Sequence, residues 1–230
     1  MINKHQISDL ILDHNNQFIV AVKPSGMASA PDQTGHANLK NMLEAYSKHD
    51  LHIITRTDRP VSGLSLFAKS QNAARNLSNQ IKENKISKSY LAIVEKAPKE
   101  ESGELVHYLF KGRSNKSIVV EETHKAAKKS ILTYSTVAKL DNYTVLKIEL
   151  KTGRFHQIRS QCSFLGHPIK GDVKYGARRA NKNRQIHLHS SSITFSQVDT
   201  GEVSYRAELP KNDDLWALVS EKIKNTDGEF

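Results

Sequence analysis

Short apolar runs bounded by turn-forming residues recur along the whole chain. Residues 17–22 (QFIVAV) form one such run, and the Lys-Pro-Ser-Gly sequence that follows predicts a turn at residues 23–26. Apolar residues at helical spacing predict helices over residues 37–46, 71–85 and 153–165, and two aspartates favour the start of a last helix over residues 215–223. Further strands are predicted over residues 64–68, 90–94, 105–110, 117–120, 132–138, 143–150, 187–195 and 202–207.

Strands outnumber helices in this pattern, and several strands follow one another without an intervening helix. That order favours an α+β fold with a mixed, largely antiparallel sheet over a doubly wound parallel sheet. No linker-like segment divides the chain, so we expect one domain over residues 1–230.

Basic residues exceed acidic ones, with 34 Lys and Arg against 24 Asp and Glu and a formal net charge of +10. This excess indicates a polyanionic partner such as nucleic acid, and a basic surface without a specific partner is the alternative. Residues 111–129 and 170–184 hold much of the excess. Within the second segment, residues 176–184 (GARRANKNR) predict a flexible loop whose cations either neutralise phosphates or only keep the loop solvated. These cations are Arg178, Arg179, Lys182 and Arg184.

Membrane and secreted classes are disfavoured by the sequence. No apolar run is long enough to span a bilayer, and residues 1–16 are too polar for a secretory signal. Cys162 is the single cysteine, which excludes a disulfide or a cysteine-based zinc site within one chain. It lies on the apolar stripe of a predicted helix, together with Ile158 and Leu165, so we expect a buried and unreactive thiol. We therefore expect a cytoplasmic protein with no membrane partner.

Motifs for phosphate loops, dinucleotide binding, zinc proteases and nucleophile elbows do not occur in the sequence. His187 and His189 would share one face of a strand, which is a weak signal for a metal site. The alternative is that both histidines are ordinary core or surface residues. We expect no metal.

An acidic residue among cations marks the turn-rich segment at residues 55–63. Asp58 lies between Arg56 and Arg59, and nearby positive charge would keep its carboxylate ionised. Such a carboxylate could act as a nucleophile or a base. The alternative is a turn aspartate that caps its own backbone.

A second polar cluster occurs at residues 151–159, where a predicted strand ends and a predicted helix begins. Arg159 lies about 100° around this helix from Ile158, near the edge of its buried stripe. Arg159 could therefore project into a cleft, and a surface helical arginine is the alternative.

Six segments match, in order, the motifs of one enzyme family across about residues 8–210. The pattern His-Arg-Leu-Asp-x-x-Thr-Ser-Gly resembles residues 55–63, where Thr55, Thr57 and Val61 replace its His, Leu and Thr. The other matches are Lys-Pro-Ser-Gly (23–26), Lys-x-Tyr-x-Ala (88–92), Thr-Gly-Arg-x-His-Gln-Ile/Leu-Arg (152–159), Leu-Gly-His-Pro-Ile-x-Gly-Asp-x-x-Tyr-Gly (165–176) and Leu-His-Ser (188–190). In this set of motifs the chain resembles the RluA-type RNA pseudouridine synthases.

The resemblance implies a fold and an activity. The expected fold is a bent, mostly antiparallel mixed sheet flanked by helices, in a single catalytic domain without an S4 RNA-binding domain. The expected reaction is isomerisation of specific uridines in ribosomal or transfer RNA to pseudouridine, by a monomer that needs no cofactor. Loss of leucine at residue 57 removes apolar packing behind the Asp58 loop, so we expect altered packing or substrate preference, or else an impaired enzyme.

The resemblance also implies roles for individual residues. Asp58 would be the essential carboxylate, either as nucleophile or by deprotonating the sugar, and Tyr90 would stack on the base and assist removal of the C5 proton. Arg159 would pair with Asp58. Arg56 would fill the space that a flipped uridine leaves. We place in the substrate-binding set, beside the loop cations named above, Ile158, Arg154, His156 and Gln157.

Two alternatives to the enzyme remain open at this point. A non-catalytic RNA-binding or assembly factor on the same fold would need the basic surface but not Asp58, Tyr90 and Arg159 together. A hydrolase that uses Asp58 as a base lacks a recognisable second acid or metal cluster.

Overall fold

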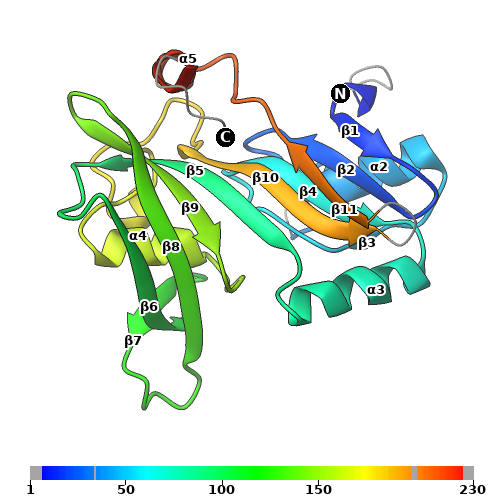
Figure 1. The fold of residues 1–230 in the computed structure, drawn as a ribbon, viewed down its shortest axis with the longest axis horizontal. Coiled ribbons are helices and arrows are strands. Elements are labelled where there is room, and N and C mark those ends of the chain that lie inside the picture. Colours follow the sequence, from blue (N-terminus) through cyan, green and yellow to red (C-terminus); the bar gives the residue numbers. More distant parts are fainter. Residues whose placement is uncertain (1–6, 34, 198–200, 225–230) are drawn as a thin grey trace. The chain divides into compact units, whose positions relative to one another are not determined.

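The computed structural model describes residues 7–33, 35–197 and 201–224 of the chain (Figure 1). The chain divides into two compact units, each of which combines a β-sheet with helices. Unit 1 comprises Met1–Lys88 and Ser190–Glu208, and unit 2 comprises Ser89–His189 and Leu209–Phe230. The α+β prediction is therefore confirmed.

The sheet of unit 1 has the strand order β1-β2-β4-β10, with β3 beside β4 and β11 beside β10. Strand β2 is antiparallel to both β1 and β4, and the β3–β4 and β10–β11 pairs are antiparallel as well. The strands are β1 (Ile11–His14), β2 (Phe18–Lys23), β3 (His52–Ile53), β4 (Ser62–Ala68), β10 (Leu188–Gln197) and β11 (Gly201–Arg206).

Alternate residues of β2 contribute to two cores, one on each face of this sheet. Phe18 packs with Leu77 of α3, whereas Ile19 packs with Leu43 of α2. Because successive side chains of a strand point to opposite faces, α2 and α3 cover opposite faces of the unit 1 sheet, as can be followed in Figure 1. The helices are α2 (Leu39–Ser47) and α3 (Gln71–Lys82).

The sheet of unit 2 has the strand order β5-β9-β8-β6-β7. All four of these neighbouring pairs are antiparallel, which fits a chain whose strands follow one another without crossover helices. The strands are β5 (Ser87–Glu95), β6 (Ser102–Lys111), β7 (Ser117–Val120), β8 (Lys128–Lys139) and β9 (Tyr143–Leu150).

Two α-helices and one 3-10 turn complete unit 2. Trp216 of α5 packs on Ile93 of β5 and Val145 of β9, and the Asp213 carboxylate caps this helix by accepting the backbone N–H of Leu215 and Trp216. The helices are α4 (Gln157–Phe164), η1 (Val173–Tyr175) and α5 (Asp214–Lys224). Within the described part of the chain, no helix is both long and apolar enough to cross a bilayer.

The start of α4 differs from the prediction. The helix begins at Gln157 rather than residue 153, because His156 has left-handed backbone geometry with φ of 51°. Gln157 also accepts the backbone N–H of Arg154, which holds the preceding residues in a loop. Leu165 was placed on the buried stripe and is instead 39% exposed, because α4 ends at Phe164.

Strands β1 and β3 were not predicted from the sequence. Both are short and carry few apolar residues, so their pairing with β2 and β4 defines them rather than their own pattern. His187 and His189 are both buried beside the Trp216 ring, which makes them core residues. Cys162 is buried as predicted, and burial raises the pKa of its thiol to about 12.

Candidate active site

The Asp58 loop of unit 1, residues 55–61, is held by one buried lysine. The Lys23 side chain is fully buried at the end of β2. Its ammonium donates to the carbonyl of Arg59 at 3.3 Å and to that of Val61 at 2.6 Å, both of which follow Asp58 in the loop. It also donates to the carbonyls of Pro24 and Met27 at 3.0 and 2.8 Å. Lys23 therefore joins the turn after β2 to the loop that carries Asp58.

The rest of the Lys-Pro-Ser-Gly motif continues this join. The Ser25 hydroxyl donates to the carbonyl of Pro60 at 2.6 Å, and the backbone N–H of Gly26 donates to the carbonyl of Arg59 at 2.8 Å. Ser29 donates from its hydroxyl to the carbonyl of Thr57 at 2.9 Å. The early motif thus serves as a template for the backbone on both sides of Asp58, a role that the sequence pattern did not reveal.

Charge around Asp58 is mostly positive. Burial lowers the pKa of Lys23 to about 7, the Asp58 carboxylate opposes that shift, and the Arg59 guanidinium adds to it. Arg59 also forms an ion pair with Asp32. Arg56 is exposed, and Asp58 itself is partly exposed. Asp58 therefore lies, partly exposed, on a loop that the buried Lys23 holds.

The three departures from the family pattern are all buried. Thr55 accepts the backbone N–H of Leu66 with its hydroxyl at 3.0 Å, so its polar group has a structural use. The Thr57 hydroxyl has no hydrogen-bond partner among the described residues, although the side chain is only 7% exposed. Val61 is 2% exposed and packs as an apolar residue.

Gly63 follows this loop and is required by a close backbone approach. Its φ is +104°, and a Cβ atom at this position would lie 2.2 Å from the carbonyl oxygen of Ser190 in β10. A side chain therefore cannot be accommodated without moving β10 away from β4. This explains why the Ser-Gly pair closes the Asp58 loop.

In unit 2, Arg159 is paired with an acid that the sequence analysis did not single out. The Arg159 Nε and Nη2 atoms donate to the two carboxylate oxygens of Asp172 at 2.6 and 2.8 Å. The exposed fractions of these side chains are 5% and 1%, so Arg159 is not a surface arginine. The Tyr175 ring lies 4.8 Å from the guanidinium carbon. Asp172 and Tyr175 both belong to the Gly-Asp-x-x-Tyr-Gly part of the motif at residues 165–176, so this motif is the sequence feature that could have identified them.

The Tyr175 hydroxyl joins this cluster to His156. It accepts the backbone N–H of Ser117 at 2.7 Å and forms a hydrogen bond with Nδ1 of His156 at 2.8 Å. Burial, with nearby Arg159, lowers the pKa of His156 to about 3, so this ring is neutral at pH 7. His156 therefore contributes a neutral ring to this cluster rather than a charge.

The other residues of this third motif are distributed between loop and helix. Gln157 is buried, and its amide oxygen accepts from Thr152 and from the Arg154 backbone while its nitrogen donates to the carbonyl of Ile131. Arg154 is exposed and donates to the carbonyl of Lys129 at 3.0 Å. Ile158 is 4% exposed. The Gln157 amide thus holds the loop that leads into Arg159.

Tyr90 belongs to unit 2. It is a residue of β5, opposite Ile148 of β9, and is 8% exposed. Strand pairing fixes its backbone, so the side chain direction is set by the sheet.

The basic segment after η1, residues 176–184, is a loop without regular structure, as predicted. We call it the anchored loop, because contacts of Asn181 hold its middle. The Asn181 amide accepts from Lys170 and donates to the carbonyl of Gln185 and to Nδ1 of His187. A Cβ atom on Gly171 would lie 2.3 Å from this amide. The anchor leaves exposed the side chains of Arg178, Arg179, Lys182 and Arg184.

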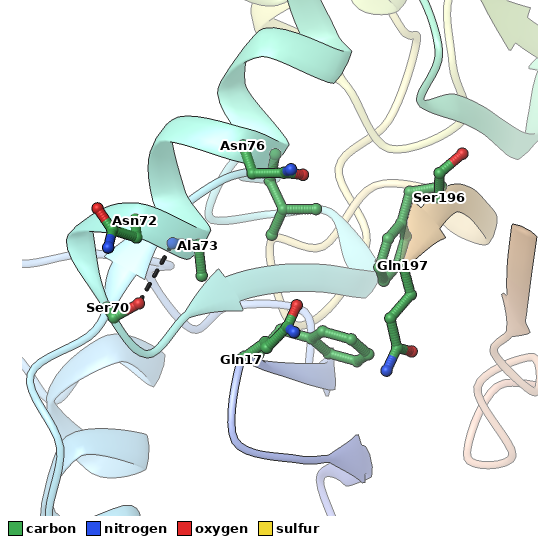
Figure 2. Close-up of a pocket in the computed structure, with 10 residues that line it drawn as sticks. Gln17, Ser70, Asn72, Ala73, Asn76, Ser196 and Gln197 are labelled. Carbon is green, nitrogen blue, oxygen red and sulfur yellow. Dashed lines mark hydrogen bonds between the residues drawn. The ribbon is translucent and has the colours of Figure 1, made fainter. Parts of the chain in front are cut away.

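A pocket of about 340 Å³ lies between α3 and the ends of β2 and β10 in unit 1 (Figure 2). Amides and hydroxyls line it together with the apolar Phe18, Leu77 and Phe195, and none of the described residues that line it has a titratable side chain. Such a pocket supplies neither a nucleophile nor an acid or base, so we do not assign the chemistry to it. Among the described residues, no group of three or more His, Cys, Asp and Glu side chains is placed to hold a metal ion.

Comparison with known proteins identifies the family. The sequence profile described as RNA pseudouridylate synthase matches residues 17–164. The chain belongs to this family. A ribosomal large subunit pseudouridine synthase C of Buchnera aphidicola is 31% identical over 82% of this chain, and the chain spans 62% of that relative's length. A tRNA pseudouridine synthase C of Haemophilus ducreyi is 30% identical over 83% of this chain and 86% of its own.

Solved structures agree on the fold of this RNA pseudouridylate synthase family member. Human RNA Pseudouridylate Synthase Domain Containing 4 aligns over 96% of this chain and 95% of its own, with a TM-score of 0.76 and 19% identity. Both the RluA-type resemblance and the predicted fold class are thus confirmed.

Proposed function

We propose that this protein isomerises specific uridines in ribosomal or transfer RNA to pseudouridine. Family membership supports the reaction class, and the names of the two relatives above supply the two RNA classes. The net charge of +10 suits a polyanionic substrate. The observation that carries the proposal is the Asp58 loop, in which a buried lysine and the Lys-Pro-Ser-Gly motif hold the backbone around one carboxylate.

The reaction conserves every atom of the uridine. The bond between C1′ and N1 breaks, the uracil rotates, and a bond between C1′ and C5 forms, while C5 loses a proton and N1 gains one. No electrons are gained or lost, so the chemistry needs only a carboxylate and a proton acceptor. We assign the first role to Asp58, as nucleophile or as the base that deprotonates the sugar. We assign to Tyr90 stacking on the base and removal of the C5 proton.

Other residues are proposed to position the substrate. A uridine inside stacked RNA must leave its stack before a protein group can reach it, which costs a few kcal/mol. The exposed Arg56 is proposed to fill the vacated space. Arg159, which Asp172 fixes in unit 2, is proposed to hold the carboxylate of Asp58 ionised. The exposed cations of the anchored loop are proposed to contact the RNA backbone.

The experiment that tests this function is the substitution Asp58→Asn. Asparagine keeps the shape and hydrogen bonding of the side chain but removes its charge and nucleophilicity. We expect no pseudouridine in a single-turnover tritium-release assay on RNA that the wild type modifies. We also expect an unchanged melting temperature and equal or tighter RNA binding, since one charge that repels phosphate is gone. Asp50→Asn, at an exposed acid of unit 1, is the matched control and should remain active.

Two results would contradict the proposal. Substantial activity in a well-folded Asp58→Asn protein would leave Asp58 as a turn residue, because asparagine serves nearly as well as aspartate in such turns. RNA binding by a wild type that leaves every uridine unmodified would favour the non-catalytic RNA-binding factor. Mapping pseudouridines in total RNA with and without the gene identifies the substrate to be used.

A further inference from the structure

A second cationic surface lies in unit 2 and shares no residue with the Asp58 loop or the Arg159 cluster. It is a groove of about 790 Å³ formed by four parts of the chain: the end of β5 and the turn after it, the end of β8 with the β8–β9 turn, Lys170, and the start of the anchored loop. We call it the hairpin groove. Five cationic side chains line it, namely Lys96, Lys139, Lys170, Arg178 and Arg179, against two acids, Glu95 and Asp141.

The fold itself uses part of this charge and leaves the rest available. The Glu95 carboxylate accepts the backbone N–H of Arg178 at 2.9 Å, which closes one side of the groove. Lys170 donates to the Asn181 amide at 2.5 Å. Lys139 forms an ion pair with Glu101, but both side chains are more than half exposed, so the pair is weak. The exposed Lys96, Arg178 and Arg179 have no side-chain hydrogen bond or ion pair within the described residues.

The groove has the features of a surface for phosphates rather than for bases. Sites for single-stranded RNA combine cations with aromatic faces on which bases stack. Tyr143 is the one aromatic residue that lines this groove, and the Lys170 ammonium lies 5.8 Å from its ring centroid. One face of that ring is therefore occupied by a cation of the protein. Paired RNA presents phosphates while its bases are hidden, which matches a groove with cations on several turns.

We propose that the hairpin groove binds the phosphate backbone of a double-stranded segment of the substrate RNA. The identity of that RNA as substrate rests on the proposed function, whereas the binding itself does not. The cations of the groove come from separate segments: Arg178 and Arg179 belong to the anchored loop, Lys96 follows β5, and Lys139 ends β8. The groove extends the basic loop into a wider contact that recognises an RNA by its helical backbone rather than by its sequence.

The test removes the two groove lysines that lie outside the anchored loop and do not contact Asn181. Lys96→Gln with Lys139→Gln keeps both side-chain lengths and removes two charges. The matched control is Lys82→Gln with Lys85→Gln, at exposed lysines at and just after the end of α3 in unit 1. The control pair is balanced with the groove pair, since Lys85 is ion-paired with an exposed Glu83 as Lys139 is with Glu101.

The measurement is fluorescence anisotropy with a short mixed-sequence RNA duplex and with single-stranded oligouridine, over a series of KCl concentrations. For the duplex, we expect the groove variant to lose about one to two units of the slope of log K against log salt, and the control to match the wild type. For oligouridine, we expect the groove variant to lose less than for the duplex.

Three results are decisive. Equal duplex slopes for the groove variant and the control would overturn the proposal. A loss for oligouridine as large as for the duplex would overturn the assignment to paired RNA. A wild type that binds the duplex through the groove but forms no pseudouridine would refute the proposed function and leave the groove in place, so the two failures are distinguishable.

Discussion

Two buried threonines of the Asp58 loop are expected to respond in opposite directions to the same substitution. Thr55 and Thr57 are 9% and 7% exposed and are separated by one residue. The Thr55 hydroxyl accepts the backbone N–H of Leu66 at 3.0 Å, whereas the Thr57 hydroxyl has no partner among the described residues. Valine has nearly the shape of threonine and no hydroxyl, so Thr→Val at each position isolates the hydrogen bond.

The magnitudes follow from these contacts. A buried polar group left without a partner costs about 1–3 kcal/mol. Thr55→Val leaves the Leu66 N–H without its acceptor and should destabilise the protein by about 1–3 kcal/mol. Thr57→Val removes a hydroxyl that already lacks a partner and should stabilise the protein by about 1 kcal/mol. For a chain of this size, 1 kcal/mol moves the melting temperature by about 2–4 °C.

Urea unfolding of the wild type and of both variants measures these differences at one temperature. The refuting result is a Thr57→Val protein that is clearly less stable than the wild type, because the hydroxyl would then have a partner in solution. If Thr57→Val is more stable but forms pseudouridine more slowly, the hydroxyl beside Asp58 is retained for turnover rather than for folding. A Thr55→Val protein that is as stable as the wild type, or more stable, would contradict the hydrogen bond to Leu66.

Three further predictions concern the buried groups that hold the site. Lys23→Met removes the ammonium from four carbonyls and should destabilise the protein by about 3 kcal/mol. Folding lowers the pKa of Lys23 from 10.5 to about 7, so unfolding of the wild type takes up a proton between these pH values. The wild type therefore gains stability as pH rises from 7 to 10.5, whereas the variant does not. We expect the difference in unfolding free energy between the two proteins, measured by urea unfolding, to widen over this pH range. Asp172→Asn should destabilise by about 3 kcal/mol, because it removes a charge that compensates the buried Arg159, and a loss below about 1 kcal/mol would contradict that pairing. Tyr90→Phe should keep its fold and its RNA affinity while product formation stalls, and normal turnover would show that the phenol hydroxyl is dispensable.

Local sequence determined most of the secondary structure and the family. Alternating or continuous apolar runs located β2, β4, β5 and β7 within a few residues, because burial on a sheet requires those patterns. Six motifs in order identified the family, since each records a turn or a contact that the fold needs. The basic loop was also predicted correctly, because a cationic segment without periodic apolar residues cannot bury a face against the core.

Tertiary structure decided which polar groups meet. The four carbonyls around Lys23 come from two segments, and Val61 lies 38 residues along the chain from the lysine. Arg159 takes its carboxylate from Asp172, beyond the end of α4, and Asn181 fixes the basic loop through His187. No periodicity predicts such pairs, because a buried charge or amide selects its partner by three-dimensional proximity and not by sequence spacing. The sequence therefore indicated candidate residues for the site, and the tertiary structure determined which polar groups contact them.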